Sequence, residues 1–422
     1  MSCKRLFSIV HLNPPSTVVK IDNCRVRSTG RKHKDHLHLR SATEVHWRGL
    51  KQDWAETRRL HVVLSVLPII PNIQFLSLCD VEINEAQQAI IFELSTLRTL
   101  VARFCRFHPS TMVPPFSHVT ALRLANIDTQ TTRRLLTIFA STLETLEVGY
   151  FHGGIGGILQ GGLIELPKLS TFTMAYHEYG TSQAILDIFK GYTSITTLHI
   201  SIHHNLSGLS FHHSDLPALR SLTCDHHLAA SLMPERPVTT YVEIFFSGKK
   251  RFCKLLTALS KTPAGITNLK LFVHDNLSLL LPSLATALQH LEQLTLKFCA
   301  RAPLLATRSS DHFSSQPLHN RPGAATMLLP KLKWVTLSVD DYIYSYFPPE
   351  SLLKECFIPL CPVLEVFECL CFAVSNPSFE FDQLPEPQRV WKVRRLPDGS
   401  WERQGPPPIP ISIATKTLRA AP

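Results

Sequence analysis

Histidines and cysteines are the residue types in this chain that could hold a metal ion. The sequence has 21 His and 11 Cys, and several of each lie close together. Adjacent histidines on a strand point to opposite faces, so such a pair needs further ligands to bind one ion, and none of the clustered cysteines has C-x-x-C spacing. We therefore expect no metal site and no cofactor. The groups considered are His33/His36/His38, His203/His204, His212/His213, His226/His227 and Cys356/Cys361/Cys369/Cys371.

Glycines that follow a strand can cradle a phosphate group. Seven of the 17 glycines fall between Gly149 and Gly162, directly after a predicted strand at 143–148. The segment matches neither the P-loop nor the G-x-G-x-x-G motif, and the sequence shows no H-E-x-x-H or G-x-S-x-G motif. We predict a loop between repeats at this position, no catalytic residue, and a protein that is not an enzyme.

Most of the positive charge lies near the N-terminus. Residues 1–60 hold 13 Lys and Arg against 5 Asp and Glu, which accounts for +8 of the net charge of +10. Such an arm could contact nucleic-acid phosphates, and that binding should weaken steeply as salt rises. Nucleic-acid association is therefore the alternative function, through Arg25, Arg27, Arg31, Lys32 and Lys34.

No segment predicts secretion or membrane insertion. The apolar stretch at 6–10 is shorter than the core of a signal peptide, and no run reaches the ~18 apolar residues of a membrane span. We expect an intracellular protein, in the cytoplasm or the nucleus, with no membrane contact. Its cysteines should then be reduced thiols that pack as small hydrophobic residues.

An apolar-x-x-apolar-x-apolar pattern recurs along most of the chain. Because 44% of the residues are hydrophobic, single matches arise by chance and only their spacing is informative. The first seven windows begin 22 to 26 residues apart. A weak match at Thr239, Val242 and Ile244 fills a later gap of 47 residues, which equals two periods. The windows begin at Ile73, Leu97, Val119, Leu143, Leu169, Ile195, Leu219, Ile266, Leu291, Leu332 and Leu364.

This period indicates leucine-rich repeats, in which a short strand returns through a helix or an irregular turn. Two windows continue to a small residue, Cys105 and Cys299, that should turn inward and bond to the backbone of the bend. We predict an α/β leucine-rich-repeat solenoid, with parallel strands on one face and helices or irregular turns on the other.

Segments between the windows carry apolar residues at helical spacing. They predict helices at 85–94, 129–140, 181–192 and 252–259. Asp128 is placed to cap the second helix, and Gly191 stands where the third should stop.

Three parts of the chain are predicted. Residues 1–45 form a basic, partly disordered N-terminal arm. Residues 46–378 hold irregular leucine-rich repeats, with a disordered insertion at about 301–327. Residues 379–422 form a hairpin cap and a Pro-rich tail.

The cap is predicted from the turn sequence Pro397-Asp398-Gly399 between short strands at 390–393 and 400–403. The strands carry Trp391 and Trp401. Terminal repeats of a solenoid must cover their open end, and this hairpin could do so.

The repeats and the closing segment VWKVRRLPDGSW together resemble the leucine-rich-repeat region of fungal F-box-like proteins, particularly the expanded sets of mushroom-forming fungi. The resemblance covers about residues 45–403. It implies a substrate receptor: in that family an N-terminal F-box docks on the adaptor of a cullin-RING ubiquitin ligase, while the repeats hold the protein to be ubiquitinated.

The F-box itself is not detected. Residues 1–45 are basic and His-rich, contain Asn13-Pro14-Pro15, and show no helical period. Either the chain is truncated or its start is misassigned, or it is a repeat-only relative that binds partners without recruiting a ligase. A cullin-RING ligase adaptor is expected as a partner only if an F-box lies upstream.

Mid-strand positions that point away from the apolar core form a mixed polar row of the kind that recognises another surface. We predict a monomeric protein-binding scaffold that uses this row, with Arg123 and Trp334 as anchors. Ser77, Val101 and Glu368 occupy further positions of the row. The predicted partner-binding residues are Arg123, Glu147, Thr173, His199, Thr223, Lys270, Thr295, Trp334 and Thr336.

Overall fold

A computed structural model of the chain divides into two compact units, Met1–Val238 and Thr239–Pro422. Each unit is described by itself. The described residues are 18–22, 43–48, 72–109, 118–149, 164–176, 182–202, 211–243, 249–273, 277–298, 329–340, 349–372 and 389–404.

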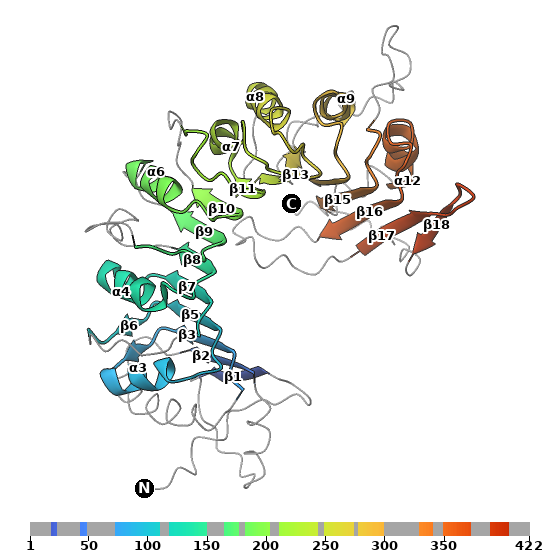
Figure 1. Cartoon of the computed structure of the whole chain (residues 1–422). Helices are drawn as coiled ribbons and strands as arrows, with labels where there is room; N and C mark the ends of the chain where they lie inside the picture. The colour runs from blue at the N-terminus through green and yellow to red at the C-terminus, as the bar shows by residue number, and fades with distance from the viewer. Residues whose placement is uncertain are drawn as a thin grey trace, which may run out of the picture. The chain divides into compact units, whose positions relative to one another are not determined.

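The first unit is a parallel sheet whose neighbouring strands are in register, and its helices lie on one side of the sheet (Figure 1). The sheet order is β1 (Val18–Asp22), β2 (Glu44–Arg48), β3 (Phe75–Cys79), β5 (Thr99–Arg103), β7 (Ala121–Ala125), β8 (Thr145–Gly149), β9 (Thr171–Tyr176), β10 (Thr197–Ile202) and β11 (Ser221–Cys224). The helices are α3 (Glu85–Phe92), α4 (Thr129–Phe139), α6 (Ser182–Gly191) and α7 (His226–Leu232). A separate parallel pair joins β4 (Glu82–Ile83) to β6 (Arg106–Phe107).

The second unit repeats this arrangement and ends in a hairpin (Figure 1). Its strands are β12 (Thr240–Glu243), β13 (Asn268–Val273), β14 (Gln293–Phe298), β15 (Trp334–Asp340), β16 (Val366–Phe372), β17 (Arg389–Arg395) and β18 (Trp401–Gln404). The first five pair in parallel, whereas β17 is antiparallel to both β16 and β18. The helices are α8 (Lys249–Leu259), α9 (Leu277–Ala287), α12 (Pro349–Leu352) and the π-helix η5 (Leu353–Phe357).

The core of each unit consists of the apolar residues of the repeat windows. All eleven window starts are buried, from Ile73 at 0% exposure to Val119 at 4%. Strands such as β3 alternate between half-buried and fully buried residues, so one face packs on the helices and the other remains accessible. The predicted α/β repeat solenoid is therefore confirmed.

The bend after each early strand shows why the repeat needs special residues there. Asp80, Phe104 and Asn126 adopt the left-handed conformation, with φ of 56°, 55° and 53°. Each of their backbone N–H groups donates to the end of the next strand, as from Phe104 to the Ala125 carbonyl at 2.8 Å. The Cys105 thiol turns inward and donates to the Leu78 carbonyl at 3.4 Å, as predicted.

The predicted helices are present. The Asp128 carboxylate accepts a hydrogen bond from the Thr131 N–H at 2.8 Å and so caps α4. Asn84 and Gln87 form a reciprocal capping box at the start of α3. The third predicted helix, α6, ends at Gly191.

One repeat was misplaced by a single residue. The weak match predicted Thr239, Val242 and Ile244 as inward residues, but Val238, Tyr241 and Glu243 are the buried ones. Glu243 breaks the apolar pattern, and its carboxylate accepts a hydrogen bond from the Phe272 N–H at 3.3 Å. A polar residue at an inward position therefore concealed the true register.

The N-terminal arm contains secondary structure that the sequence analysis did not identify. β1 and β2 pair in parallel, although neither contains a leucine window. β-branched residues such as Val18, Val19 and Ile21 favour the strand conformation. The basic residues 25–34, the loop expected after Gly149, Cys299 and the insertion at 301–327 lie outside the described residues.

A buried arginine, Arg236, forms hydrogen bonds with the segments that precede and follow β11. Arg236 is 2% exposed, and its guanidinium donates to the carbonyls of His212 at 2.6 Å, Asp215 at 2.7 Å and Leu232. Burial lowers the pKa of this side chain, while Asp215 and Glu235 oppose that effect. One side chain thus donates to a carbonyl at the end of α7 and to two carbonyls of the irregular chain before β11.

We expect Arg236→Met to lower the free energy of unfolding by about 3 kcal/mol, because the substitution removes buried hydrogen bonds to the carbonyls of Asp215, Leu232 and His212, of which His212 keeps a bond from the Asp215 N–H. Urea denaturation followed by circular dichroism measures the change. Arg106→Met, at an exposed position, is the control and should change stability by less than about 0.5 kcal/mol. Equal midpoints for the two variants would contradict this role of Arg236.

Candidate functional site

The strand register of the first unit lines up the predicted partner-binding residues. Mid-strand residues of adjacent strands are direct partners, from β2 to β11. Because side chains of one row project from the same face, this row lies on the accessible face of the sheet. The row runs through His46, Ser77, Val101, Arg123, Glu147, Thr173, His199 and Thr223.

Arg123 and Glu147 form the ion pair of this row. Their Nε and Oε2 atoms are 3.3 Å apart, and the two side chains are 46% and 31% exposed. An exposed pair of this kind contributes less than about 1 kcal/mol to stability. Its main effect is to hold a donor and an acceptor at fixed positions on the accessible face.

Hydroxyl groups dominate the same face between β8 and β11. Thr145, Thr171, Thr197 and Ser221 are register partners in the row next to the central one. The central row adds Thr173 and Thr223, and all six residues are half-buried. This part of the face offers hydrogen-bonding groups with little charge.

The second unit continues the pattern with charged and aromatic residues. Its central row consists of Lys270, Thr295, Thr336, Glu368, Lys392 and Gln404. The adjacent row consists of Asn268, Gln293, Trp334, Val366 and Arg394. All predicted partner-binding residues of this unit therefore lie on one face. Lys270, Thr295 and Thr336 are in the central row, and Trp334 is in the adjacent row.

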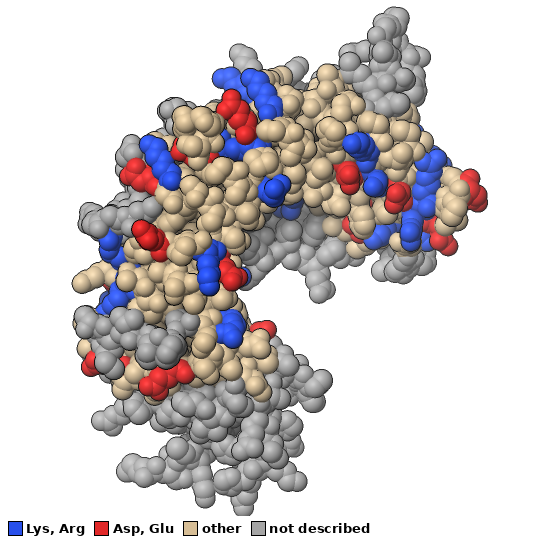
Figure 2. Space-filling model, viewed as in Figure 1, with Lys and Arg blue, Asp and Glu red and all other residues tan. Residues whose placement is uncertain are grey.

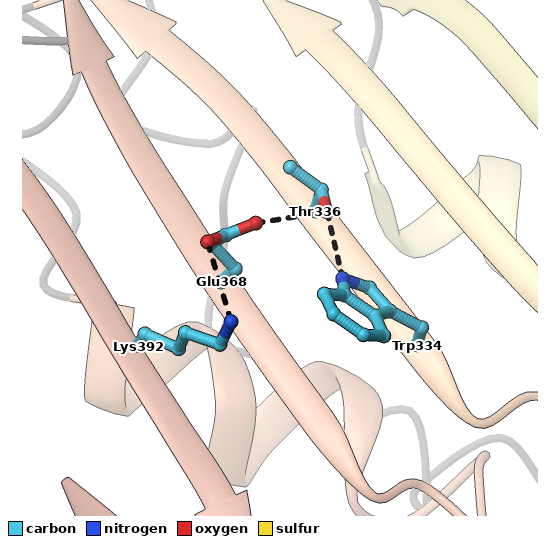
Figure 3. Close-up of polar contacts among 4 residues, drawn as sticks. All are labelled: Trp334, Thr336, Glu368 and Lys392. Atoms are coloured by element: carbon cyan, nitrogen blue, oxygen red, sulfur yellow. Dashed lines mark hydrogen bonds and ion pairs between the residues drawn. The ribbon is translucent and has the colours of Figure 1, made fainter. Parts of the chain in front are cut away.

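Four of these residues form a connected polar network (Figure 3). The Trp334 indole N–H donates to the Thr336 hydroxyl at 3.1 Å, and that hydroxyl lies 3.5 Å from the Glu368 carboxylate. Lys392 Nζ lies 3.9 Å from the other Glu368 oxygen and 4.9 Å from the centre of the Trp334 ring. The ring is thus held in place while 37% of the residue remains exposed.

A hollow of about 380 Å³ lies beside this network. Trp334 and Val366 supply apolar surface, and charged groups surround them. Its lining residues are Glu292, Gln293, Lys333, Trp334, Glu365, Val366, Lys392, Arg394 and Gln404. This volume is at the lower end of the range for small-molecule pockets, and its walls are polar and apolar in about equal parts.

Lys392 is the residue of the network that the sequence analysis missed, and Glu368 was named only as a position of the row. Lys392 reaches the row because β17 runs antiparallel to β16, which pairs it with Glu368. The signal was available in the alternation within β17, where Trp391 and Val393 are buried. Val101 lies in the row but is only 4% exposed, so it offers a partner little surface.

Among the residues that the structure describes, no group of three His, Cys, Asp or Glu side chains is placed to hold a metal ion. The rings of His212 and His213 lie 3.9 Å apart. Burial raises the pKa of Cys105, Cys361 and Cys369 to about 12, so these thiols stay protonated near neutral pH.

Charges of both signs are scattered over the visible face (Figure 2). Other residues cover most of the described surface in this view, and Lys or Arg side chains lie next to Asp or Glu in several places.

In the described part of the chain, no helix is long and apolar enough to span a bilayer.

No protein family matches the sequence, and no curated protein matches it. Among solved structures, a chain in the crystal structure of the yeast Rad7 and Elc1 complex is similar, with 14% sequence identity and a TM-score of 0.35. The match covers 77% of each chain.

We expect the buried thiols to resist alkylation. At pH ~8, iodoacetamide should modify the exposed Cys253 and spare Cys105, Cys361 and Cys369, because a thiol with a pKa of about 12 holds almost no thiolate. Peptide mass spectrometry reads out each site, and urea should make all four reactive. Modification of Cys369 as fast as Cys253 in the folded chain would contradict the packing.

Proposed function

We propose that this chain is a protein-binding scaffold and that the accessible face of its parallel sheet is the binding surface. The observation that supports the proposal is the register itself. It places the residues Arg123, Glu147, Thr173, His199 and Thr223 in one row of the first unit. It places Lys270, Thr295, Thr336 and Trp334 on the same face of the second.

The composition of the face suits a macromolecular partner. Interfaces combine a few aromatic or arginine anchors with a surround of polar residues. Trp334 is the exposed aromatic residue here, and Arg123 is an exposed arginine held by Glu147. A row that crosses strand after strand presents a broad surface, whereas small molecules need a deep and mostly apolar pocket.

The finer part of the proposal is that the chain recognises substrates for an F-box type ubiquitin ligase. It rests on the resemblance of the repeats and the closing segment to fungal F-box-like proteins. On this proposal the chain acts inside the cell, in the cytoplasm or nucleus, as a monomer and without catalysis of its own. It reaches a cullin-RING adaptor only if an F-box lies upstream.

Affinity purification of the tagged full chain with mass spectrometry tests both parts of the proposal, binding through the sheet face and recruitment of a ligase. Arg123→Ala with Trp334→Ala should reduce recovery of the specific partner about tenfold or more, since anchors carry much of an interface's energy. Thr137→Ala with Lys254→Ala, at exposed helix positions, is the matched control and should leave recovery unchanged. Melting temperatures should agree for all three proteins.

The outcomes distinguish binding through the sheet face from recruitment of a ligase. Full recovery of partners with the Arg123 and Trp334 variant would contradict binding through the sheet face. Loss of a partner without any cullin adaptor among the purified proteins would support the scaffold and argue against recruitment of a ligase.

A further inference from the structure

We propose that the accessible face of the second unit, from β13 to β17, binds an acidic polypeptide segment, with one of its side chains seated in the hollow beside Trp334. This inference rests on the proposed function and names the partner's chemistry. We call this surface the β13–β17 face. The face consists of the central row, the outward rows on either side of it, and the residues just before the strands. It includes Lys270, Lys297, Lys333, Trp334, Glu368, Lys392 and Arg394.

Cations outnumber carboxylates on the β13–β17 face. Among the described side chains five cations stand there, against the carboxylates Glu292, Glu365 and Glu368, and Glu402 of β18 is the register partner of Arg394. Lys333 offsets Glu292, and Lys392 offsets Glu368, each at 3.9 Å. The surplus of positive charge favours a partner with negative side chains.

Lys270 lies at one end of this surface, and it has no acidic neighbour among the described residues. It occupies the central row on β13, beside Val242 and Thr295 in the register. No described carboxylate lies within ion-pair distance of its ammonium group. A carboxylate of a bound segment would therefore meet Lys270 without displacing an existing ion pair.

Trp334 provides a prearranged apolar contact in the middle of the face. Its indole N–H is bound by Thr336, and the Lys392 ammonium stands over its ring (Figure 3). Because these contacts fix the side chain before binding, little conformational entropy is lost when a partner packs on it. The exposed 37% of Trp334 can contact the aliphatic stem of a partner side chain.

The hollow beside Trp334 matches one side chain that ends in a carboxylate. Its volume is about 380 Å³, and its lining includes three cationic groups, Lys333, Lys392 and Arg394, against two carboxylates, Glu292 and Glu365. An extended chain that crosses from β13 to β17 covers four strand spacings, or about 19 Å, which takes about six residues. One segment can therefore reach both Lys270 and the hollow.

The first unit does not offer the same surface. Between β8 and β11, Glu147 is the one Asp, Glu, Lys or Arg in the outward rows of the described strands. An acidic segment would find no cation in these rows. Elsewhere in the first unit Arg103 and Arg123 point outward from β5 and β7, and Arg123 is already paired with Glu147.

Selection of peptides from a displayed random library on the immobilised full chain tests the inference. We expect Asp and Glu to be enriched in the selected peptides over the starting library. Fluorescence anisotropy with a labelled selected peptide should give a Kd that rises about tenfold or more for Lys270→Glu and for Trp334→Ala. Affinity should also fall as salt rises.

Lys254→Glu is the matched control, because it makes the same charge change at an exposed position on helix α8. It should leave the Kd unchanged. Circular dichroism checks folding, and Lys270→Glu is the decisive variant if Trp334→Ala is destabilised.

Peptides without acidic enrichment, an unchanged Kd for Lys270→Glu, or no selected peptide at all would overturn the inference. Selected peptides that respond to Arg123→Ala but not to Lys270→Glu would leave the scaffold function standing and reject this site. RNA that binds the same residues with higher affinity than the peptides would indicate a nucleic-acid site and overturn the inference. A peptide that binds with higher affinity than RNA would support it.

Discussion

The parallel strand ladder is the constraint on which the rest of this structure depends. Each repeat has an apolar face too small to fold alone, and it buries that face only against its neighbours. A buried leucine side chain contributes about 2 kcal/mol, and every described window supplies such residues. Because the side-chain period of a strand is two, the inward leucines also determine which residues point outward. The row of polar residues on the accessible face is a consequence of the core.

The ends of the strands show how the ladder tolerates irregular sequence. The left-handed bends at Asp80, Phe104 and Asn126 keep the backbone bonded to the following strand. Arg236 fulfils a similar need where the chain leaves the regular pattern, by donating to carbonyls near β11. In the second unit the hairpin of β17 and β18 closes the sheet, and Gly399 takes the φ of 84° that its turn requires. The same hairpin brings Lys392 beside Glu368, so the cap also completes the face.

The sequence predicted the leucine windows, the connecting helices and most of the outward row, since all of these follow from short-range periodicity. The predicted register was wrong where a polar residue stands at an inward position. Glu243 occupies an inward position, and the register around β12 was therefore shifted by one. β1 and β2 escaped detection because they contain no leucine window. The alternation within β17 indicates that Lys392 points outward, but its contact with Glu368 and the rest of the network around Trp334 depend on the pairing of strands separated by long segments and on the antiparallel return of β17.

Distances between spin labels test the ladder most directly. Cysteine substitution would place one label at Ser77, with the second at Glu147, Thr173 or His199. Cys253, which is exposed among the described cysteines, and any other native cysteine that takes up the label are replaced first. The register separates these pairs by three, four and five strands. Pulsed electron resonance should therefore give distances that rise by about 5 Å from each pair to the next. Distances that stay constant, or that change without order, would contradict a parallel in-register sheet and with it the whole account of the binding face.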